Sequence, residues 1–576
     1  MQKGFIVIIL SVLALTMTTF CTGDKTPKGE NAVNLYYNQV GYIYHGPKLL
    51  LVAESINRVI ILDQDGNEVF AVTPEPALYW EQSGDAVRKV DFSHLTKKGN
   101  YTVALPEVNE KHPLKITERP FTEVAKAGLK AFYFNRTAIP IEPQYGGKWA
   151  RPAGHPDTIV YVHSSAADEN RPEGTIISSP LGWYDAGDYN KYIVNSGITT
   201  YTMFKALHDY AEYFRQLDVN IPETGSGVPD LLSEIMFNYK WMLTMQDPHD
   251  GGVYHKLTNK NFDGIVMPHE ATNDRYVVAK STTAALNFAA VAAKAYRVLQ
   301  DYERHYPGIA EKGLRQAERA MEWALNNPDV PYIQPEDIHT GAYGDREFGD
   351  EFFWAAAELW LSTGKEKYVD IMIENYRKPT VPTWQDVMAL GFISLLDDYN
   401  KLPQALRETG LRDDFFALVD ELTTTSKTSP YGVSIENFVW GSNSSVANEG
   451  FLKLTAYRLT GKEDYLHSAL SDMDYILGRN ATGYCFVTGF GQKKVMNIHH
   501  RPSEADDVED PVPGFLAGGP NTSVFTDCPP EMERSQYPAK SFIDHWCSYS
   551  TNEIAINWNA PLVYLSGALD ALMKKD

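Results

Sequence analysis

The chain has 576 residues, and its 52 basic and 74 acidic side chains give a formal net charge of −22. Hydrophobic residues make up 43% and charged residues 22%, which excludes a disordered chain and favours about two to four globular domains. Strong binding to nucleic acid needs clustered Lys and Arg to neutralise phosphates, and the sequence has no long basic run, so we expect no nucleic-acid partner. A neutral polysaccharide is not repelled by this charge, and an aromatic content of 12% supplies rings for stacking.

Residues 1–21 have the pattern of an export signal. Lys3 provides a positive start, and the apolar run from Phe5 to Leu15 is too short to remain as a spanning helix. Cys21 follows and precedes a polar stretch, which is typical of a bacterial lipoprotein whose cysteine is acylated after cleavage. An ordinary cleaved secretory signal is the alternative, and both export the protein. We expect an outer-membrane, periplasmic or cell-surface location, membrane contact only through a lipid on Cys21, and a linker over 22–32.

The other three cysteines carry no recognisable pattern. Cys485, Cys528 and Cys547 are odd in number and lack the spacing of metal ligands. From this we infer neither a disulfide framework nor a zinc site.

Residues 33–117 predict a small all-β domain. Short runs of β-forming residues recur between turn signals such as Asp63 to Asn67 and Lys98 to Asn100, with no helical pattern. This spacing is typical of an immunoglobulin-like sandwich. No chemical constellation appears in the domain, so we expect it to pack against and stabilise the next one. The predicted strands lie near 33–37, 48–53, 58–62, 69–72, 87–92, 101–104 and 114–116.

From residue 118 to 576 apolar residues recur with a period of 3.6 residues, typical of helices, in place of the two-residue period of strands. Met203 to Phe214 and Leu231 to Met242 each place apolar residues on one helical face. About a dozen such stretches are joined by long Gly- and Pro-rich loops, which tend to carry binding and catalysis. A dozen helices can form a double ring, although periodicity alone does not show closure. The further predicted helices lie near 121–134, 281–299, 311–326, 350–363, 367–377, 385–399, 412–423, 445–460, 463–477 and 553–574.

The stretch from Gly182 to Tyr192 is the strongest candidate for chemistry. Asp185 and Asp188 are separated only by small residues, so the backbone can turn and both carboxylates can face one space. Two carboxylates at such a short distance from each other cannot both ionise freely. The alternative to a chemical site is a solvated loop in which one Asp caps a helix. Flanking aromatics, and no basic partner before Lys191, favour a sugar-processing site, because sugar rings stack on aromatic faces while their hydroxyls bind carboxylates.

A second candidate region lies late in the chain, in the helix-poor stretch near 479–550. His499, His500 and Arg501 supply donors for sugar hydroxyls or charge to tune a carboxylate. Adjacent histidines point apart in an extended chain, so ligation of one metal ion by both is the weaker interpretation. Further on, Glu553 opens an apolar helix, where an acid is often only a complement to the helix dipole.

Together these segments resemble glycoside hydrolase family 9, in the subgroup with an N-terminal immunoglobulin-like domain. The motifs follow in the family's order and cover nearly everything after the signal. Two positions depart from the family pattern, Cys485 and Trp558, and neither touches a carboxylate. The matching segments are Asn38–Tyr42, Trp183–Tyr192, Gly227–Leu232, Met245–Asp247, Gly252–Lys256, the His-His-Arg segment, and the final stretch containing Asp544, Tyr549 and Glu553.

The resemblance implies an (α/α)6 barrel that hydrolyses β-1,4-glucan with inversion. It implies that Asp188 is the general base, that Asp185 helps to hold the attacking water and that Glu553 is the general acid. An inverting enzyme keeps its acid and base about 6.5–9.5 Å apart to leave room for water. The remaining implied roles are substrate binding near the cleavage point by the histidine segment, with His499, His500 and Arg501, and support of the acid's surroundings by Asp544.

Several expectations accompany this assignment. Candidate stacking platforms are Trp183, Tyr184, His255, Trp384, Trp440 and Trp558, each of which has a packing role as an equal alternative. No cofactor is expected for catalysis, and Asp350 with Glu351 resembles a calcium position of some members, although a plain helix start explains the pair equally well. The expected substrate is a β-glucan polysaccharide or oligosaccharide, of cellulose-like, mixed-linkage or xyloglucan type. The alternatives are an exo-acting β-glucosidase or glucosaminidase and a non-catalytic surface glycan-binding protein.

Overall fold

The computed structural model describes residues 33–572. The predicted signal, the acylated Cys21 and the linker lie outside the described residues. Within the described range, no helix combines the length and the apolar character needed to cross a bilayer.

The first part of the described chain forms two facing sheets. One sheet has the strand order β1-β3-β7-β6 and the other β2-β9-β8-β4-β5. Apolar side chains from both, among them Leu50, Val59 and Val103, make a core between them. The expected sandwich is present, with two short strands that the sequence did not indicate, β2 and β6. The bounds are β1 Leu35–Tyr36, β2 Tyr42–Ile43, β3 Leu49–Ala53, β4 Val59–Leu62, β5 Glu68–Val72, β6 Leu78–Trp80, β7 Asp85–Asp91, β8 Gly99–Leu105 and β9 Glu110–Thr117.

The second part is helical, and twelve of its helices form a double ring. The inner helices contact one another in a closed cycle, α3 to α6 to α8 to α10 to α13 to α17 and back to α3. Each outer helix packs on an inner one: α1 on α17, α5 on α3, α7 on α6, α9 on α8, and α12 and α14 on α13. The bounds of the inner helices are α3 Ile193–Asp209, α6 Thr282–Leu299, α8 Gly349–Thr363, α10 Met388–Asp397, α13 Ser442–Thr460 and α17 Ile556–Leu572. The bounds of the outer helices are α1 Thr122–Phe134, α5 Asp230–Met242, α7 Ile309–Asn326, α9 Lys367–Glu374, α12 Leu411–Thr428 and α14 Glu463–Ile476.

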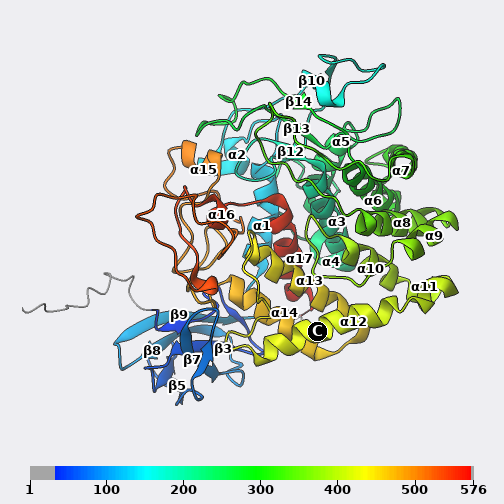
Figure 1. The fold of residues 1–576 in the computed structure, drawn as a ribbon. Helices are drawn as coiled ribbons and strands as arrows, with labels where there is room; N and C mark the ends of the chain where they lie inside the picture. Colours follow the sequence, from blue (N-terminus) through cyan, green and yellow to red (C-terminus); the bar gives the residue numbers. More distant parts are fainter. Residues whose placement is uncertain (1–32, 573–576) are drawn as a thin grey trace, which may run out of the picture.

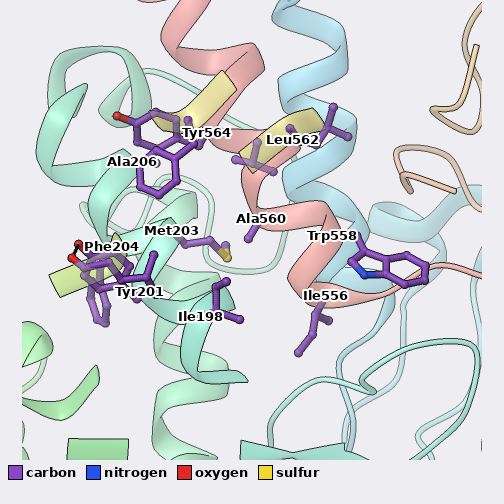
Figure 2. Packing of buried hydrophobic residues seen from close by; sticks show 14 of the residues in the cluster. Ile198, Tyr201, Met203, Phe204, Ala206, Ile556, Trp558, Ala560, Leu562 and Tyr564 are labelled. Atoms are coloured by element: carbon purple, nitrogen blue, oxygen red, sulfur yellow. Dashed lines mark hydrogen bonds between the residues drawn. The ribbon is translucent and has the colours of Figure 1, made fainter. Parts of the chain in front are cut away.

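Hydrophobic patterning explains which helices lie inside. In α3 and α17 nearly every side chain is buried, because neighbours surround both helices. Outer helix α7 buries one stripe at helical spacing, made mostly of small residues such as Ala310, Gly313 and Ala317, and leaves its polar side chains in solvent. Figure 2 shows Ile198, Tyr201 and Tyr564 among the side chains packed around α3 and α17.

Short elements occupy the connections. A small sheet with the order β11-β10-β14-β13-β12 lies in the loops that lead to α3 and α6. The sandwich lies at one edge of the helical domain, beside α14 (Figure 1). The remaining short elements are α2 Pro143–Gly146, β10 Val160–Val162, β11 Ile176–Ile177, β12 Lys191–Tyr192, α4 Ala211–Arg215, β13 Lys256–Thr258, β14 Tyr276–Val277, α11 Gln404–Glu408, α15 Arg501–Ala505 and α16 Tyr549–Asn552.

Candidate active site

The candidate site lies where connections enter the N-terminal ends of the inner helices. The acidic turn precedes α3, and Glu553 precedes α17. Their backbones meet directly, since Ile556 N donates to Asp185 O at 2.8 Å and Arg501 N donates to Gly187 O at 3.1 Å. A Cβ at Gly187 would lie 2.1 Å from His499 O, so only glycine permits this approach. The fold therefore joins the early acids to the late histidine segment and Glu553.

Asp185 is completely buried and held by three hydrogen bonds. Asn195 Nδ2 donates to both of its carboxylate oxygens, at 3.0 and 2.9 Å, and Tyr343 Oη donates to Oδ2 at 3.0 Å. Burial, reinforced by the neighbouring Asp188, raises the pKa of Asp185 well above its usual range. The carboxylate is thus fixed in direction at the base of the acidic turn.

Asp188 is 6% exposed, so it alone of the two turn acids retains contact with solvent. Asn190 Nδ2 donates to its Oδ2 at 2.5 Å, and Tyr192 Oη donates to the same oxygen at 3.2 Å. Both bonds leave Oδ1 open to accept a proton from water. Lys191, the nearest base in sequence, points elsewhere and pairs with Asp157 at 2.7 Å.

Glu553 has an extended backbone between α16 and α17, with φ −68° and ψ 161°. The expectation that it opens a helix is wrong, because residue 553 pairs with His499 in a parallel bridge and α17 begins at Ile556. Burial raises the pKa of the Glu553 carboxyl well above its usual range, and the charges of Asp188 and Asp185 raise it further. The bridge between His499 and Glu553 and the hydrogen bond from Arg501 N to Gly187 O bring Glu553 to the acidic turn.

His499 and Asp544 lie on the wall beside Glu553. His499 Nδ1 donates to Trp546 O at 2.9 Å, and its ring stacks on that of Trp546 with centroids 4.2 Å apart. Asp544 accepts from Met496 N and Asn497 N, both at 2.8 Å, and from Asn552 Nδ2 at 3.0 Å. Asp544 therefore fixes the segment before His499 and the residue before Glu553 together.

The two neighbours of His499 have different surroundings. Arg501 donates through Nη1 to Gly187 O at 2.8 Å and through Nε to Asp263 O at 2.9 Å, so it braces the acidic turn. His500 is buried, bonds Ser503 Oγ at 2.9 Å and packs on Phe515. Burial lowers its pKa to about 3. These contacts anchor His500 to Ser503 and Phe515, and its assignment to substrate binding stays a prediction.

The rings of four of the six predicted stacking platforms are buried, and their stacking role stays a prediction. Trp183 is 0% exposed and donates to Glu234, while Tyr184 bonds His155 at 2.8 Å. His255 uses both ring nitrogens, toward Ser281 and Ala342, and stacks on another ring. Trp558 packs in the main hydrophobic core.

Two platforms remain available at the site. Trp384 is half-buried and packs edge-on against Tyr343, at 5.1 Å. Trp440 is 41% exposed and lies 5.4 Å from Tyr549, which in turn contacts the His499 ring at 5.9 Å.

Comparison with known proteins matches both parts of the chain. Residues 121–566 fit the model of glycosyl hydrolase family 9, and residues 30–110 fit that of the cellulase N-terminal Ig-like domain. The chain belongs to glycosyl hydrolase family 9. It is therefore a glycoside hydrolase, and the resemblance drawn from its motifs is confirmed.

Individual relatives of family 9 match over almost their full length. The chain is 43% identical to a xyloglucan-specific endo-β-1,4-glucanase of Bacteroides ovatus, over 98% of this chain and 97% of that one. It is 29% identical to endoglucanase D of Acetivibrio thermocellus, over 98% and 86%. A solved structure of a Bacteroides ovatus family 9 protein superposes with a TM-score of 0.88 at 42% identity, covering 94% of this chain and 99% of that one.

Two tyrosines at the site were not predicted from the family 9 motifs. Tyr343 binds Asp185, and its backbone has a positive φ of 50°, which is uncommon outside glycine. Tyr192 binds Asp188, and its ring meets that of Tyr343 at 4.7 Å. Tyr192 stands at the end of the quoted acidic motif, so it could have been found. Tyr343 lies in a loop without a motif, so its position depends on the fold.

One cysteine inference is wrong. Cys528 and Cys547 form a disulfide, with Cα atoms 5.1 Å apart, and Cys485 is a buried free thiol. The spacing of the cysteines in the sequence does not predict this pairing, because a loop of irregular structure brings the two sulfur atoms together.

A separate acidic cluster precedes and opens α8. Asp350 and Glu351 are 0% exposed, and Asp345 lies in the loop before them. Asp345 Oδ2, Asp350 Oδ1 and both carboxylate oxygens of Glu351 are buried without a hydrogen bond. Burial, with Asp350 and Asp345 nearby, raises the pKa of Glu351 well above its usual range. Arg377 Nη2 lies 3.6 Å from Asp350 Oδ1, whereas neither oxygen of Glu351 has a hydrogen bond or an ion pair to any described residue, and such oxygens fit a hard cation.

Proposed function

We propose that the protein is an inverting endo-β-1,4-glucanase. The observation that supports it best is the direct contact of the acidic turn with the segment that carries Glu553, through Ile556 N to Asp185 O and Arg501 N to Gly187 O. Burial and the charges of Asp188 and Asp185 also raise the pKa of Glu553. A raised pKa keeps Glu553 protonated, as a general acid requires.

Three residues of the chain then carry separate parts of the reaction. Asp188 accepts a proton from water through its open oxygen, while Asp185, anchored by Asn195 and Tyr343, holds that water for attack on the anomeric carbon. Glu553 donates its proton to the leaving glycosidic oxygen. Attack from the side opposite the leaving group inverts the anomeric carbon.

The substrate proposal rests on relatives and on exposed rings. The similar Bacteroides ovatus protein is described as xyloglucan-specific, and we propose xyloglucan as the preferred glucan here. Trp384 and Trp440 remain available to stack on sugar rings. A comparison of kcat/KM on xyloglucan, cellulose-like and mixed-linkage chains tests this proposal. Viscosity falling before reducing ends accumulate indicates internal cuts, and the reverse order favours the exo-acting alternative.

Substitution of the carboxyls tests the mechanism. Glu553→Gln and Asp188→Asn each keep the size of the side chain, so we expect folding to be kept and turnover to fall by about 10³-fold or more. Circular dichroism and initial rates on a soluble β-glucan measure both properties. Turnover within a few-fold of wild type in either variant rules out these roles.

We further propose that the protein is an exported lipoprotein anchored through Cys21. The supporting pattern is the apolar run followed by a cysteine and a polar stretch. Expression in a bacterium with labelled palmitate should label wild type but not Cys21→Ala. A wild-type protein recovered without label would contradict lipidation and favour an ordinary cleaved secretory signal.

We also propose that Asp350 and Glu351 contribute to a structural calcium site. The two buried oxygens of Glu351 have no hydrogen-bond partner among the described residues, and oxygen ligands suit calcium. Such an ion would neutralise the cluster at the start of α8. We expect calcium to raise the melting temperature of wild type and a chelator to lower it, with no response in Glu351→Gln. Equal melting curves in calcium and chelator would refute the proposal.

A further inference from the structure

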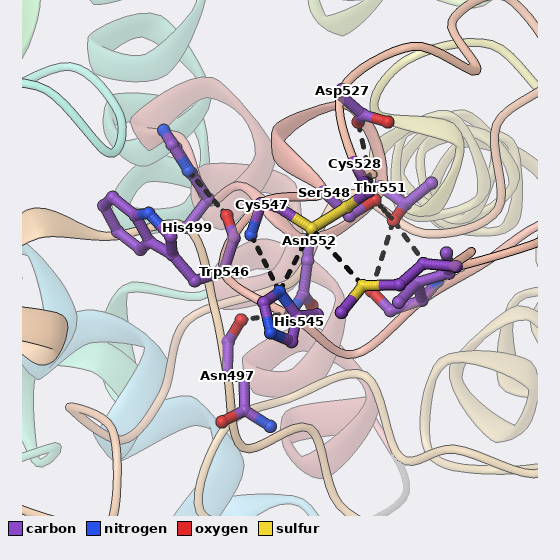
Figure 3. Close-up of a disulfide and its surroundings, with 12 residues drawn as sticks. Asn497, His499, Asp527, Cys528, His545, Trp546, Cys547, Ser548, Thr551 and Asn552 are labelled. Carbon is purple, nitrogen blue, oxygen red and sulfur yellow. Dashed lines mark hydrogen bonds between the residues drawn. A yellow bond between two sulfur atoms is a disulfide. The ribbon is translucent and has the colours of Figure 1, made fainter. Parts of the chain in front are cut away.

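The segment that carries Asp544 and Trp546 is closed by a disulfide. Cys528 and Cys547 are 19 residues apart and half-buried, so a small reductant can reach them. Between them the chain forms one short 3-10 turn, Pro538–Lys540, so few backbone hydrogen bonds fix its course. Figure 3 shows the disulfide close to His499 and Trp546.

The residue before Cys547 orients a site residue. Trp546 O accepts from His499 Nδ1 at 2.9 Å, and because a carbonyl only accepts, this nitrogen must carry the proton. The neutral ring then keeps Nε2 as an acceptor for a sugar hydroxyl, and burial, which lowers the pKa of His499 to about 4, keeps it neutral. Stacking at 4.2 Å fixes the plane of the ring. Trp546 thus sets both the tautomer and the direction of His499.

The residue before Cys528 holds the other part of the same wall. Asp527 is 1% exposed in its side chain and accepts from Ser550 N at 3.0 Å and Ser550 Oγ at 2.6 Å. Arg534 pairs with Asp527 and donates to Ser548 Oγ at 3.0 Å. Ser550 lies on α16, immediately before Glu553. Asp527 therefore fixes the approach to the general acid.

The disulfide joins these two contacts covalently. We propose that the Cys528–Cys547 disulfide is a positioning element of the active site, which keeps Trp546 against His499 while Asp527 holds the approach to Glu553. The inference rests on the proposed function, because it takes His499 as a group that binds sugar beside the cleavage point. Once the bond is open, Trp546 can leave His499, and the ring loses its fixed plane and proton position.

Reduction of the intact enzyme tests the proposal. Dithiothreitol converts the disulfide to two thiols and is itself oxidised to a cyclic disulfide, so thiol titration should rise by two per chain. At a temperature well below the melting transition, we expect kcat/KM on a soluble β-1,4-glucan to fall about tenfold. Far-ultraviolet circular dichroism should not change. The double variant Cys528→Ser/Cys547→Ser should behave like the reduced enzyme, and Cys485→Ser should respond to the reductant like wild type.

A double-mutant cycle separates positioning from plain stabilisation. In His499→Ala the ring is absent, so reduction should lower kcat/KM by no more than about twofold. The proposal is overturned by an unchanged kcat/KM in reduced wild type, by an equal loss in His499→Ala, or by loss of the fold on reduction. Failure of the proposed function is seen separately, as an oxidised wild type that does not cleave β-1,4-glucans.

Discussion

At the scale of single residues, the site depends on negative charge that is buried and shared. Asp185 is buried without any basic partner among its hydrogen bonds, and its donors are the neutral Asn195 and Tyr343. Neutral donors orient a carboxylate without cancelling its charge. That charge therefore still acts on Glu553, whose pKa it raises together with Asp188. The general acid is thus tuned by the two acids of the turn.

This coupling predicts the pH dependence of Asp185→Asn. A general acid must be protonated, so activity is lost as pH rises through the pKa of Glu553. Removing the Asp185 charge removes one cause that raises this pKa, so the alkaline limb of kcat/KM should move to lower pH. The residual activity of the variant, followed across pH, measures the shift. A limb that stays in place would contradict the electrostatic account.

Tyr343 supports a second prediction at this scale. Tyr343→Phe removes one hydrogen bond to a carboxylate while keeping the ring that packs on Tyr192 and Trp384. Such a bond is worth about 1.5–3 kcal/mol, so we expect kcat to fall about 10-fold to 150-fold. The melting temperature should change little. An unaltered kcat would mean that Asp185 is oriented without the tyrosine.

At the scale of helices and strands, the sequence predicted more of the structure than it did at the scale of single residues. Strong 3.6-residue periodicity located α6, which runs from Thr282 to Leu299 where 281–299 was expected. The start of α3 was missed, because Ile193 to Thr202 is buried on all sides and so lacks an amphipathic pattern. The short strands β10 to β14 also lacked a signal, since two- and three-residue strands show no periodicity. Ring closure depends on contacts between distant helices and is not a property of any one of them.

The contact between α1 and α17, where Leu562 lies against Gly128, predicts a stability effect without a catalytic one. Leu562 is 0% exposed in α17, so Leu562→Ala leaves a cavity and should destabilise the protein by about 2–5 kcal/mol. The KM of the folded enzyme should not change, because Leu562 lies two turns into the helix, away from Glu553. Leu325→Ala is the matched control, since this leucine is 43% exposed on α7. Equal melting curves for the two variants would contradict the packing described for the inner ring.

At the scale of the whole molecule, the sandwich and the helical domain share a core. Tyr36, Ile43 and Val87 belong to the same buried cluster as the inner helices. Gln39 also binds the connection that leads to His499, through Gly483 O at 2.7 Å and through the backbone nitrogens of Gln492 and Lys493. The sequence predicted a stabilising β domain, but these contacts join residues more than 400 apart and could not be read from it.

This interface predicts the effect of removing the sandwich. A chain that begins at residue 118 exposes apolar surface around Tyr431 and leaves the 477–493 connection without Gln39. We expect a lower melting temperature and a kcat/KM reduced several-fold. Gln39→Ala, which keeps the shared apolar core, should show a smaller loss of both. An isolated helical domain with wild-type melting and activity would show that the interface has no such role.

The acidic turn meets the late segment through its main chain, where Asp185 O and Gly187 O accept hydrogen bonds from Ile556 N and Arg501 N. During synthesis the first of these partners emerges several hundred residues before the second. The sandwich and the early helices can therefore pack before α17 is in place, whereas the ring closes only when this helix joins it. A chain folded only to that point has no proton donor opposite its base, so it gains the power to cut glucan only when the Glu553 segment and α17 complete the ring.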